Sequence, residues 1–472
     1  MAINESDLAA LDVAATRAKD FRRRMATADA TPTADYDTIH ARFDRPAPEE
    51  GFDASAVIEE LVTGAEEGMR GLVAPRFYAW VNGSSHLAGV AADWLTSAWG
   101  QNCAGVPMSP AAAAVEAVAA RWLLELLDLS PECSVGFVTG ATVANFVGLA
   151  AARNEQLRKA GWNVEDDGLF GAPPVSVVIG ADAHSTVFQA LRYVGFGAKR
   201  VRTVATDSFG RMLVSDFERA LKEADGPVVA IGQAGQINTG VSDPFAEIVP
   251  LVRQTDGWLH VDGAFGLWAN ASKRHRHLLE GVELADSWAT DGHKWLQTPY
   301  DCGFAICRNE AAHRRAMDLT ASYLAPAGSH QRHPGAYVPE LSRRARGFAT
   351  WAMIRRLGRN GIAQMVDEDV RLAKLMAASL AEIDGVEVVN QPELNQFVVL
   401  FGADRGADEG DRLTLATIER IQQDAVAYLG SSLWHDRWVM RVSVCSIQTT
   451  EDDALLTVQA IKDAWQAVQD AT

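Results

Sequence analysis

The chain alternates short apolar runs with longer amphipathic stretches through most of its length. The runs are rich in valine and isoleucine, and they lie at residues 135–138, 175–179, 201–204, 228–231, 258–261 and 304–306. Buried strands that alternate with helices are typical of a mostly parallel sheet. Ser109 followed by Pro110 marks one helix start, because serine caps the first turn and proline fits its first position. The pattern predicts a large α/β domain over residues 86–355.

Two other patterns flank this central region. Residues 6–26 carry apolar side chains at helical spacing, and the segment 1–85 is too small to bury a core of its own. We therefore expect a helical N-terminal segment that packs on a partner subunit. Toward the C-terminus the periodicity predicts helices at 340–358, 361–383, 411–428 and from about 450, with short strands at 386–389, 396–401 and 438–444. We expect residues 356–472 to form a small C-terminal α+β domain.

Composition narrows the class of protein. The 472 residues suit two or three packed units, and a chain that is 48% hydrophobic and 22% charged can bury a large core. A net charge of −18 argues against binding to nucleic acid or to an anionic membrane surface. The N-terminus lacks the apolar region of a secretory signal, and no stretch approaches the ~18 uninterrupted apolar residues of a membrane span. Five cysteines without metal-ligand spacing indicate a reducing compartment and no metal site, so we expect a cytoplasmic protein.

The most informative residues are a lysine and an aspartate, each just past an apolar run. Lys294 follows His293, and Asp262 lies 294 − 262 = 32 residues upstream. A lysine amine can hold the aldehyde of pyridoxal 5'-phosphate (PLP) as an imine, while a carboxylate keeps the pyridine nitrogen protonated. Trp295 places the lysine against the core, where an amine must be paired or uncharged. The pair predicts a PLP site.

A phosphate site is predicted in the stretch 136–145, which reads as strand, tight turn and helix. Backbone N–H groups at the start of a helix bind phosphate without side-chain charge. Gly140 and Ala141 allow close approach of the phosphate, and Thr142 adds a hydroxyl. Glycine turns before helices are common, so this stretch predicts a phosphate site only in combination with Lys294 and Asp262.

Three further residues complete the predicted cofactor site. His184 follows the strand at 175–179, where its ring is placed to stack on the cofactor. Ala264 is small enough to let the ring lie close to the backbone. His293 is expected to contact the phosphate or to move a proton at the reacting carbon.

Together these stretches resemble the group II PLP-dependent decarboxylases, which act on aromatic amino acids, histidine, glutamate or cysteine sulfinate. The resemblance covers roughly residues 70–460 and is most specific at Asp286-Ser287, followed after five residues by His293-Lys294-Trp295. It implies PLP-dependent transferase fold type I, which is aspartate aminotransferase-like, with a mostly parallel seven-stranded sheet. It also implies a homodimer with active sites at the interface. The family's lysine maps onto Lys294, its pyridinium partner onto Asp262 and its stacking residue onto His184.

The chain departs from the family pattern near the phosphate and the ring. The family usually carries Gly-Gly and Glu in the phosphate turn, where this chain has Gly140-Ala141 and Val143. Gly235-Gln236-Ile237 stands in place of a Gly-Thr-Thr element, and Asp291 replaces an asparagine two positions before the His-Lys pair. A carboxylate near a phosphate repels it unless it is protonated or turned away. We keep Gln236 and Asp291 as candidate cofactor contacts and expect a subfamily with a different substrate or altered chemistry.

The resemblance also implies a tyrosine on a mobile loop that returns a proton to the substrate carbon across the dimer. The segment 328–337 is polar and contains glycine, as a lid should. Tyr337 is the candidate within it and Tyr323 is the rival. The alternative is that Tyr337 is an ordinary surface tyrosine.

The substrate side chain is the least determined feature of the sequence. The pocket is expected to draw on four residues, Phe77, Trp80, Trp99 and Asn102. The aromatic members favour an aromatic or apolar amino acid, although such a cluster is equally typical of packing. An acidic substrate would need an arginine, for which Arg76 and Arg346 are the candidates.

The sequence therefore predicts decarboxylation of an L-amino acid to its amine and CO2. Three alternatives stay open. The first is decarboxylation coupled to oxidative deamination, which yields an aldehyde. The second is another fold-type-I reaction, that of an aminotransferase or lyase. The third is a protein that keeps PLP for assembly without catalysis.

Overall fold

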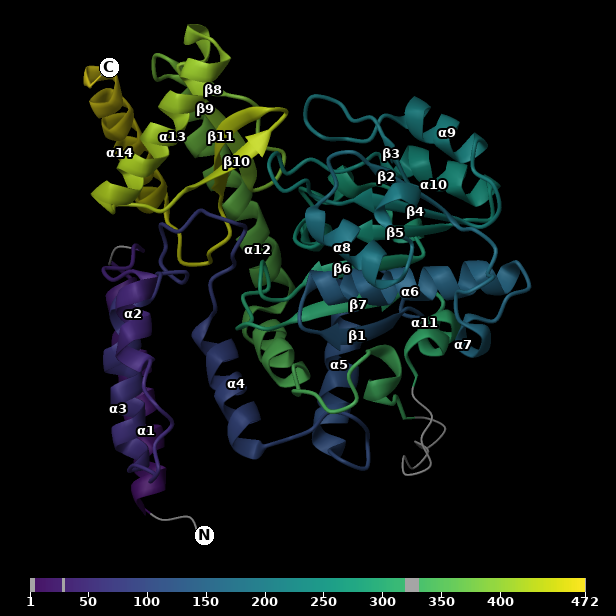
Figure 1. Ribbon diagram of the computed structural model, residues 1–472, viewed down its shortest axis with the longest axis horizontal. Coiled ribbons are helices and arrows are strands. Elements are labelled where there is room, and N and C mark those ends of the chain that lie inside the picture. Colours follow the sequence, from purple (N-terminus) through teal and green to yellow (C-terminus); the bar gives the residue numbers. More distant parts are fainter. Residues whose placement is uncertain (1–4, 28–29, 319–330, 472) are drawn as a thin grey trace. The chain divides into compact units, whose positions relative to one another are not determined.

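The computed structural model describes residues 5–27, 30–318 and 331–471 (Figure 1). The chain divides into two compact units. The large unit comprises Gly83–Ala377 and Val388–Val398, and the small unit comprises Met1–Asn82, Ala378–Glu387 and Val399–Thr472. The N-terminal segment thus groups with the C-terminal part of the chain. The expected boundary at 355/356 falls inside one helical span, α12 (Gly347–Ala381), and the structure divides the chain further on.

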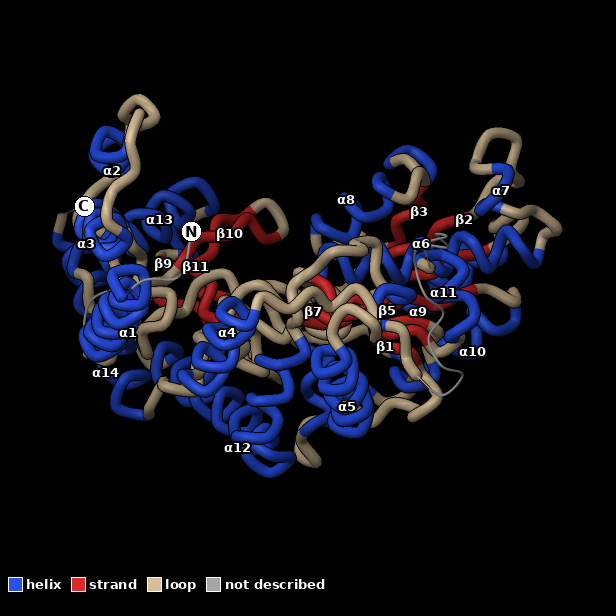
Figure 2. The backbone as a smooth tube through the Cα atoms, turned by 90° about the horizontal axis from the view of Figure 1, so that it is seen from below, coloured by secondary structure: helices blue, strands red, loops and turns tan. Residues whose placement is uncertain are grey.

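The large unit is built on a seven-stranded sheet with the order β1-β7-β6-β5-β4-β2-β3 (strands in red in Figure 2). Its strands are β1 (Ser134–Val138), β2 (Ser176–Gly180), β3 (Val201–Val204), β4 (Val228–Gln233), β5 (Trp258–Asp262), β6 (Ser287–Asp291) and β7 (Gly303–Cys307). Only β7 runs antiparallel to its neighbours, β1 and β6. The predicted mostly parallel sheet and fold type I are confirmed.

Helices cover this sheet, so most of its strands contain a continuous apolar run. Those of the large unit are α4 (Leu87–Trp99), α5 (Pro110–Leu126), α6 (Ala141–Lys159), α7 (Val164–Asp167), α8 (Ser185–Tyr193), α9 (Val214–Lys222), α10 (Phe245–Gln254) and α11 (Glu310–Met317). Helix α5 begins as predicted, because the Ser109 hydroxyl accepts the N–H of Ala112 at 3.2 Å. Helix α6 lies along β5, β6 and β7 and is buried over most of its length (Figure 1).

The strand order brings chain segments that are distant in sequence to one edge of the sheet. Parallel strands collect ligand-binding residues at their carboxyl ends. Strand β5 ends at Asp262, which pairs in register with Gln233 of β4 and Ala289 of β6. Strand β6 ends at Asp291, and α6 begins three residues after β1. The predicted cofactor residues therefore come from adjacent strand ends.

The small unit contains the N-terminal helices α1 (Glu5–Met25), α2 (Tyr36–Phe43) and α3 (Ala54–Ala65) and the C-terminal helices α13 (Ala407–Asp424) and α14 (Glu451–Asp470). A four-stranded sheet has the order β10-β11-β9-β8, with β8 (Val386–Val388), β9 (Gln396–Phe401), β10 (Gly430–Trp434) and β11 (Arg437–Ser443). The helix predicted at 411–428 begins and ends earlier, as α13, and strand β10 follows it. Among the described residues, no helix combines the length and apolar character that crossing a membrane requires.

A buried ion cluster ties α5 to the chain that precedes α12. Glu116 accepts two hydrogen bonds from Arg343 and one from Arg332, each at 2.8 Å, and its side chain is fully buried. Burial alone would raise the pKa of the Glu116 carboxyl, but the two arginines outweigh it and hold this pKa below its ordinary value. The cluster therefore contributes stability at neutral pH, which is lost as the pH falls through the lowered pKa.

Removing this carboxylate should be costly. We expect Glu116→Ala to lower the free energy of unfolding by about 3–5 kcal/mol, because two arginines lose their buried partner. Glu125→Ala, on the exposed face of the same helix, is the matched control and should cost less than about 1 kcal/mol. Urea-induced unfolding of both variants measures the difference. Equal midpoints for the two would contradict this prediction.

Candidate active site

Lys294 lies in the turn that follows strand β6. Its Nζ is 3.3 Å from Oδ2 of Asp291, and its side chain is 16% exposed. The same Nζ lies 5.9 Å from the centre of the Phe265 ring. The amine therefore faces one carboxylate and one aromatic ring, in a largely buried place where a reactive nitrogen is protected from bulk water.

The backbone of this turn is held from two sides. A Cβ on Gly83 would lie 2.2 Å from the carbonyl oxygen of Lys294, so only glycine allows the segment at 83–86 to pass this close. The next residue, Trp295, is fully buried, and its indole N–H donates to the carboxylate of Asp369 at 2.5 Å. These contacts fix the position from which the lysine side chain extends.

Asp262 ends strand β5 and is buried. Its Oδ1 accepts the N–H of Ala264 at 3.2 Å. Burial raises the pKa of the Asp262 carboxyl, while the charges of His184 and Lys294 act in the opposite direction. Asp262, His184 and Lys294 thus lie close enough to interact electrostatically, as the sequence predicted.

His184 caps the N-terminus of α8. Its Nδ1 accepts the N–H of Thr186 at 3.3 Å and lies 2.7 Å from the Thr186 hydroxyl. Its backbone N–H donates to the side chain of Gln233 at 3.1 Å. The cap fixes the imidazole at the carboxyl end of β2, beside the strand ends of β4 and β5.

The start of α6 is closely packed on β7 and His293. A Cβ on Gly303 would come within 2.5 Å of the Cα of Gly140, and a Cβ on Gly140 would lie 3.0 Å from the ring of His293. Thr142 stands in the first turn of the helix and is half-buried. Gly140, which the sequence predicted for a phosphate turn, therefore lies where the backbone packs too closely for a larger side chain.

Asp291 is turned into this helix start. Its Oδ1 accepts the backbone N–H of Ala141 at 2.6 Å and lies 3.5 Å from Nε2 of His293. Its Oδ2 faces Lys294, and its side chain is 3% exposed. The carboxylate thereby satisfies a helix N-terminal donor and the lysine at once.

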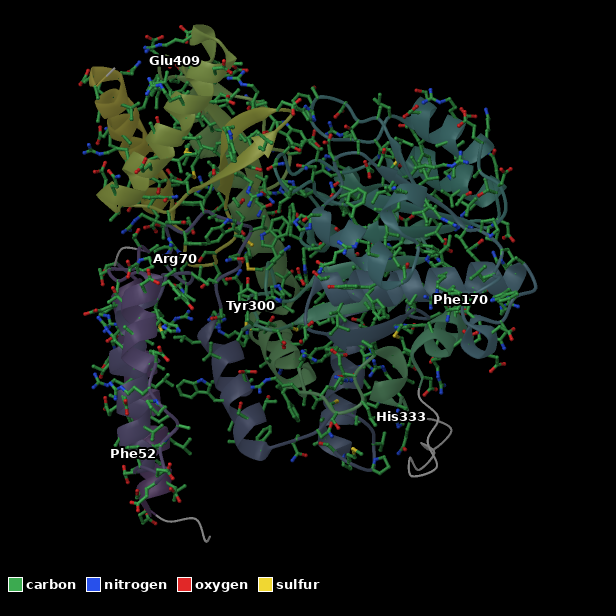
Figure 3. All side chains as sticks on the ribbon, in the orientation of Figure 1. Phe52, Arg70, Phe170, Tyr300, His333 and Glu409 are labelled. Carbon is green, nitrogen blue, oxygen red and sulfur yellow. The ribbon has the colours of Figure 1, made fainter. Side chains whose placement is uncertain are left out.

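His293 links this carboxylate to the chain that enters β7. Its Nδ1 accepts the N–H of Cys302 at 3.2 Å, so Nε2 carries the proton and points toward Asp291. Burial lowers the pKa of His293, and Asp291 opposes that shift. The ring also lies 4.4 Å from the ring of Tyr300, centre to centre (Tyr300 is labelled in Figure 3).

Gln236 and Ala264 hold the surrounding loops. The Gln236 amide oxygen accepts the N–H groups of Asn238 and Thr239, and its nitrogen donates to the carbonyl of Asp182 at 3.3 Å. Both ends of this amide are engaged with backbone, so Gln236 connects the loop after β4 to the loop after β2. The carbonyl of Ala264 accepts the N–H of Asp291 at 2.9 Å and so joins the ends of β5 and β6.

The structure corrects the assignment of Tyr337 to a mobile lid. Tyr337 is buried in a 3₁₀ turn, and its hydroxyl donates to Glu310 at 2.5 Å. Its ring packs against His313 and beneath the guanidinium of Arg332, at 5.3 and 4.6 Å. These contacts make it part of the core beside α11, away from the Lys294 cluster. Its rival, Tyr323, lies outside the described residues.

The expected substrate residues fall into two groups. Phe77 and Trp80 belong to the small unit, where both contact the ring of Tyr428, at 5.3 and 5.7 Å between centres. Trp99 and Asn102 belong to the large unit and contact the chain around the start of α12, Trp99 through Phe348. The structure brings Phe77 and Trp80 into ring contact, at 5.8 Å between centres, whereas Trp99 and Asn102 each contact a different residue before or at the start of α12.

The two arginine candidates for an acidic substrate are already paired. Arg76 donates to Asp453 at 3.0 Å within the small unit, with both side chains 15% exposed. Arg346 donates to Asp301 at 2.9 Å in the large unit, and its own side chain is 7% exposed. Each guanidinium already has a carboxylate partner from the chain itself.

Sequence reasoning missed two residues that shape the lysine environment. Phe265 directly follows Ala264, so its nearness to Lys294 could have been inferred once the end of β5 was assigned. Gly83 carries no such signal, because its close packing on the lysine turn joins segments more than 200 residues apart.

The residues that are present fit PLP. The small residues at the start of α6 leave room for a phosphate, the buried Asp262 suits a ring nitrogen, and Lys294 supplies the amine. Asp291 is the exception, because it occupies a donor that a phosphate would use.

Comparison with known proteins agrees with this fit. The family model described as "Pyridoxal-dependent decarboxylase conserved domain" matches residues 37–402. The chain is 26% identical to an aromatic-L-amino-acid decarboxylase of Bacillus atrophaeus over 94% of this chain and 92% of that protein. It is also 26% identical to a 4-hydroxyphenylacetaldehyde synthase of Rhodiola rosea, over 90% and 86% of the two chains. A solved structure of Oryza sativa TDC with PLP and tryptamine has the same fold, with a TM-score of 0.92, 23% identity and 99% coverage of both chains.

The close packing at Gly83 gives a testable consequence. We expect Gly83→Ala to displace the lysine turn, lowering stability by about 1–3 kcal/mol and weakening the binding of PLP. Gly51→Ala is the control, since a Cβ there meets nothing within 4 Å. Thermal unfolding and the absorbance of the bound cofactor measure the two effects. A Gly83→Ala protein that matches the Gly51→Ala protein in both would show that the close contact is unimportant.

Proposed function

Because the chain belongs to the pyridoxal-dependent decarboxylase family, we propose that it converts an L-amino acid to its amine and CO2 at Lys294. Membership makes it a PLP-dependent enzyme of the carboxy-lyase class. The observation that supports the proposed site is the convergence of Lys294, Asp262 and the start of α6 at one edge of the sheet.

Each residue of the cluster has a distinct task in this proposal. When bound, PLP supplies an aldehyde for the substrate amine and a ring that accepts electrons as CO2 leaves. The buried carboxylate of Asp262 would accept a hydrogen bond from the ring nitrogen and keep it protonated. His184, fixed by its cap on α8, would flank the ring, and the N–H groups of α6 would hold the phosphate.

Lys294 and His293 handle protons on the other side of the site. The Lys294 amine would hold the cofactor before substrate binds, and its place beside the site would also let it accept or donate a proton. Its neighbour His293 keeps a proton on Nε2, directed at Asp291. The turn 291–294 therefore contains two groups that can exchange protons in the proposed mechanism, the Lys294 amine and Nε2 of His293.

We propose an aromatic or apolar amino acid as the substrate. Arg76 and Arg346 are each engaged with a carboxylate of the chain, which disfavours an acidic side chain. The half-exposed indole of Trp99, in the large unit with the lysine, supports an aromatic partner.

The proposed assembly is a homodimer with active sites at its interface. The N-terminal helices support it, because α1 buries no residue and leaves Leu8 and Leu11 exposed, while α3 exposes Val57 and Leu61. Apolar side chains along packed helices favour a further protein surface as their partner. A cytoplasmic location remains a prediction, consistent with five cysteines that are buried and lie outside any disulfide in the described part of the chain.

The primary test identifies both the lysine and the reaction. Incubated with PLP and a pool of L-amino acids, the protein should consume one that is aromatic or apolar, and mass spectrometry should show the loss of CO2. Borohydride reduction should attach the cofactor to Lys294. We expect Lys294→Ala to lower kcat by about three orders of magnitude, whereas the exposed control Lys222→Ala should not change it. Labelling of another residue, or a fully active Lys294→Ala protein, would refute the proposal.

A second candidate, aldehyde formation, is favoured by one observation: the buried Tyr337 is not placed to return a proton to the substrate carbon. The similarity to an aldehyde synthase of Rhodiola rosea supports the same reading. Amine formation would then depend on another donor, for which Tyr323 is the remaining candidate from the sequence.

Paired variants separate these two products. We expect Tyr337→Phe to leave the ratio of amine to aldehyde unchanged while lowering stability by about 1 kcal/mol, because only a buried hydrogen bond is lost. Tyr323→Phe should shift the products toward aldehyde, ammonia and peroxide, with dissolved O2 as the oxidant that is reduced to the peroxide. Quantifying all four products is the measurement. If only Tyr337→Phe changed the ratio of amine to aldehyde, Tyr337 would be the proton donor after all.

A further inference from the structure

The side chain of Asp291 accepts a hydrogen bond from a backbone N–H at the start of α6, which the phosphate of the cofactor would also need. Its Oδ1 accepts the N–H of Ala141, in the first turn of a 19-residue helix, at 2.6 Å. This N–H is where a helix offers an anion both a hydrogen bond and a favourable dipole. One donor cannot serve a carboxylate and a phosphate in the same way, and two anions this close repel each other.

The backbone of Asp291 cannot move to relieve this conflict. Its N–H donates to Ala264 and its carbonyl accepts the indole N–H of Trp268, both at 2.9 Å. The residue is the last of strand β6, paired with Gly303 on β7. Relief must therefore come from rotation of the side chain or from loss of its charge.

The groups around the carboxylate decide between these routes. On its own turn it faces Lys294 and His293, and across the neighbouring strand ends it interacts with Asp262 and Cys302. The first turn of α6 offers backbone N–H groups and the Thr142 hydroxyl, and residues 141–144 carry no titratable side chain. Lys294 is the cation nearest to Asp291, and attachment to the cofactor takes its free amine away.

We propose that Asp291 competes with the phosphate of the cofactor for the start of α6, and that the protein takes up a proton on Asp291 as the phosphate binds. The inference rests on the proposed placement of the phosphate at this helix. It makes cofactor loading proton-linked: affinity for a phosphorylated ligand falls as the pH rises, because the required proton becomes harder to supply. An asparagine at 291 keeps the acceptor for Ala141 and removes the charge.

The test uses ligands that do not react with Lys294. Pyridoxamine 5'-phosphate and pyridoxamine differ only in the phosphate, and calorimetry gives their affinities from pH 6 to 9. Asp291→Asn should bind pyridoxamine 5'-phosphate more tightly than the wild type does. The ratio of the two affinities, variant over wild type, should rise by up to about tenfold per pH unit. Because both proteins bind the same ligand at each pH, the titration of the phosphate itself affects both affinities equally and cancels in their ratio. Pyridoxamine should bind both proteins equally.

Two variants serve as controls. Asp286→Asn makes the same change just before β6, where the carboxylate accepts the N–H of Leu259, and should leave both affinities unchanged. Asp291→Glu keeps the charge and should keep the pH dependence. Calorimetry in buffers of different ionisation enthalpy should show proton uptake for the wild type and less for Asp291→Asn.

Several results would overturn the inference. These are equal affinity of wild type and Asp291→Asn at every pH, a gain that is independent of pH, weaker binding by Asp291→Asn, or an equal gain for pyridoxamine. None of these measurements requires turnover. Failure of the wild type to decarboxylate any amino acid would count against the proposed function and leave this comparison of affinities intact.

Discussion

The pairing of buried charge at the carboxyl ends of β5 and β6 is the constraint on which the site depends. An amine and two carboxylates, those of Lys294, Asp262 and Asp291, meet where little water enters. A buried charge is tolerated only when it is paired or hydrogen-bonded. The parallel sheet supplies the pairing, because adjacent strand ends place residues that are distant in sequence within reach of one another.

Local patterns in the sequence predicted the scaffold of this site well. Six apolar runs became strands, and the Ser109-Pro110 pair marked the start of α5, because strand periodicity and helix capping are properties of neighbouring residues. Asp262 and His184 were predicted just past apolar runs, and the structure places them at the end of β5 and shortly after β2, with Lys294 shortly after β6. Family membership confirms the cofactor that this constellation predicted.

Features that depend on three-dimensional contacts were not predictable in this way. Strand β10 was missed and α13 was placed four residues late, because short strands and helix ends carry weak local signals. The segment around Tyr337 has the glycine and polar residues of a lid. Its tyrosine nevertheless found a buried partner in Glu310, a contact that no spacing reveals. The grouping of the N-terminal helices with the C-terminal part of the chain is likewise a long-range property.

Two of the residues that depart from the family pattern, Gln236 and Asp291, form hydrogen bonds or ion pairs with neighbouring groups. These contacts help to decide whether the site is active or degraded. A degraded site would leave buried polar groups without partners. Among the described residues, Gln236 uses both ends of its amide, and Asp291 uses both oxygens of its carboxylate. Gln236 and Asp291 are therefore built into the hydrogen bonding of the strand ends. This argues for a distinct working version of the decarboxylase site and against a protein that retains PLP for assembly alone.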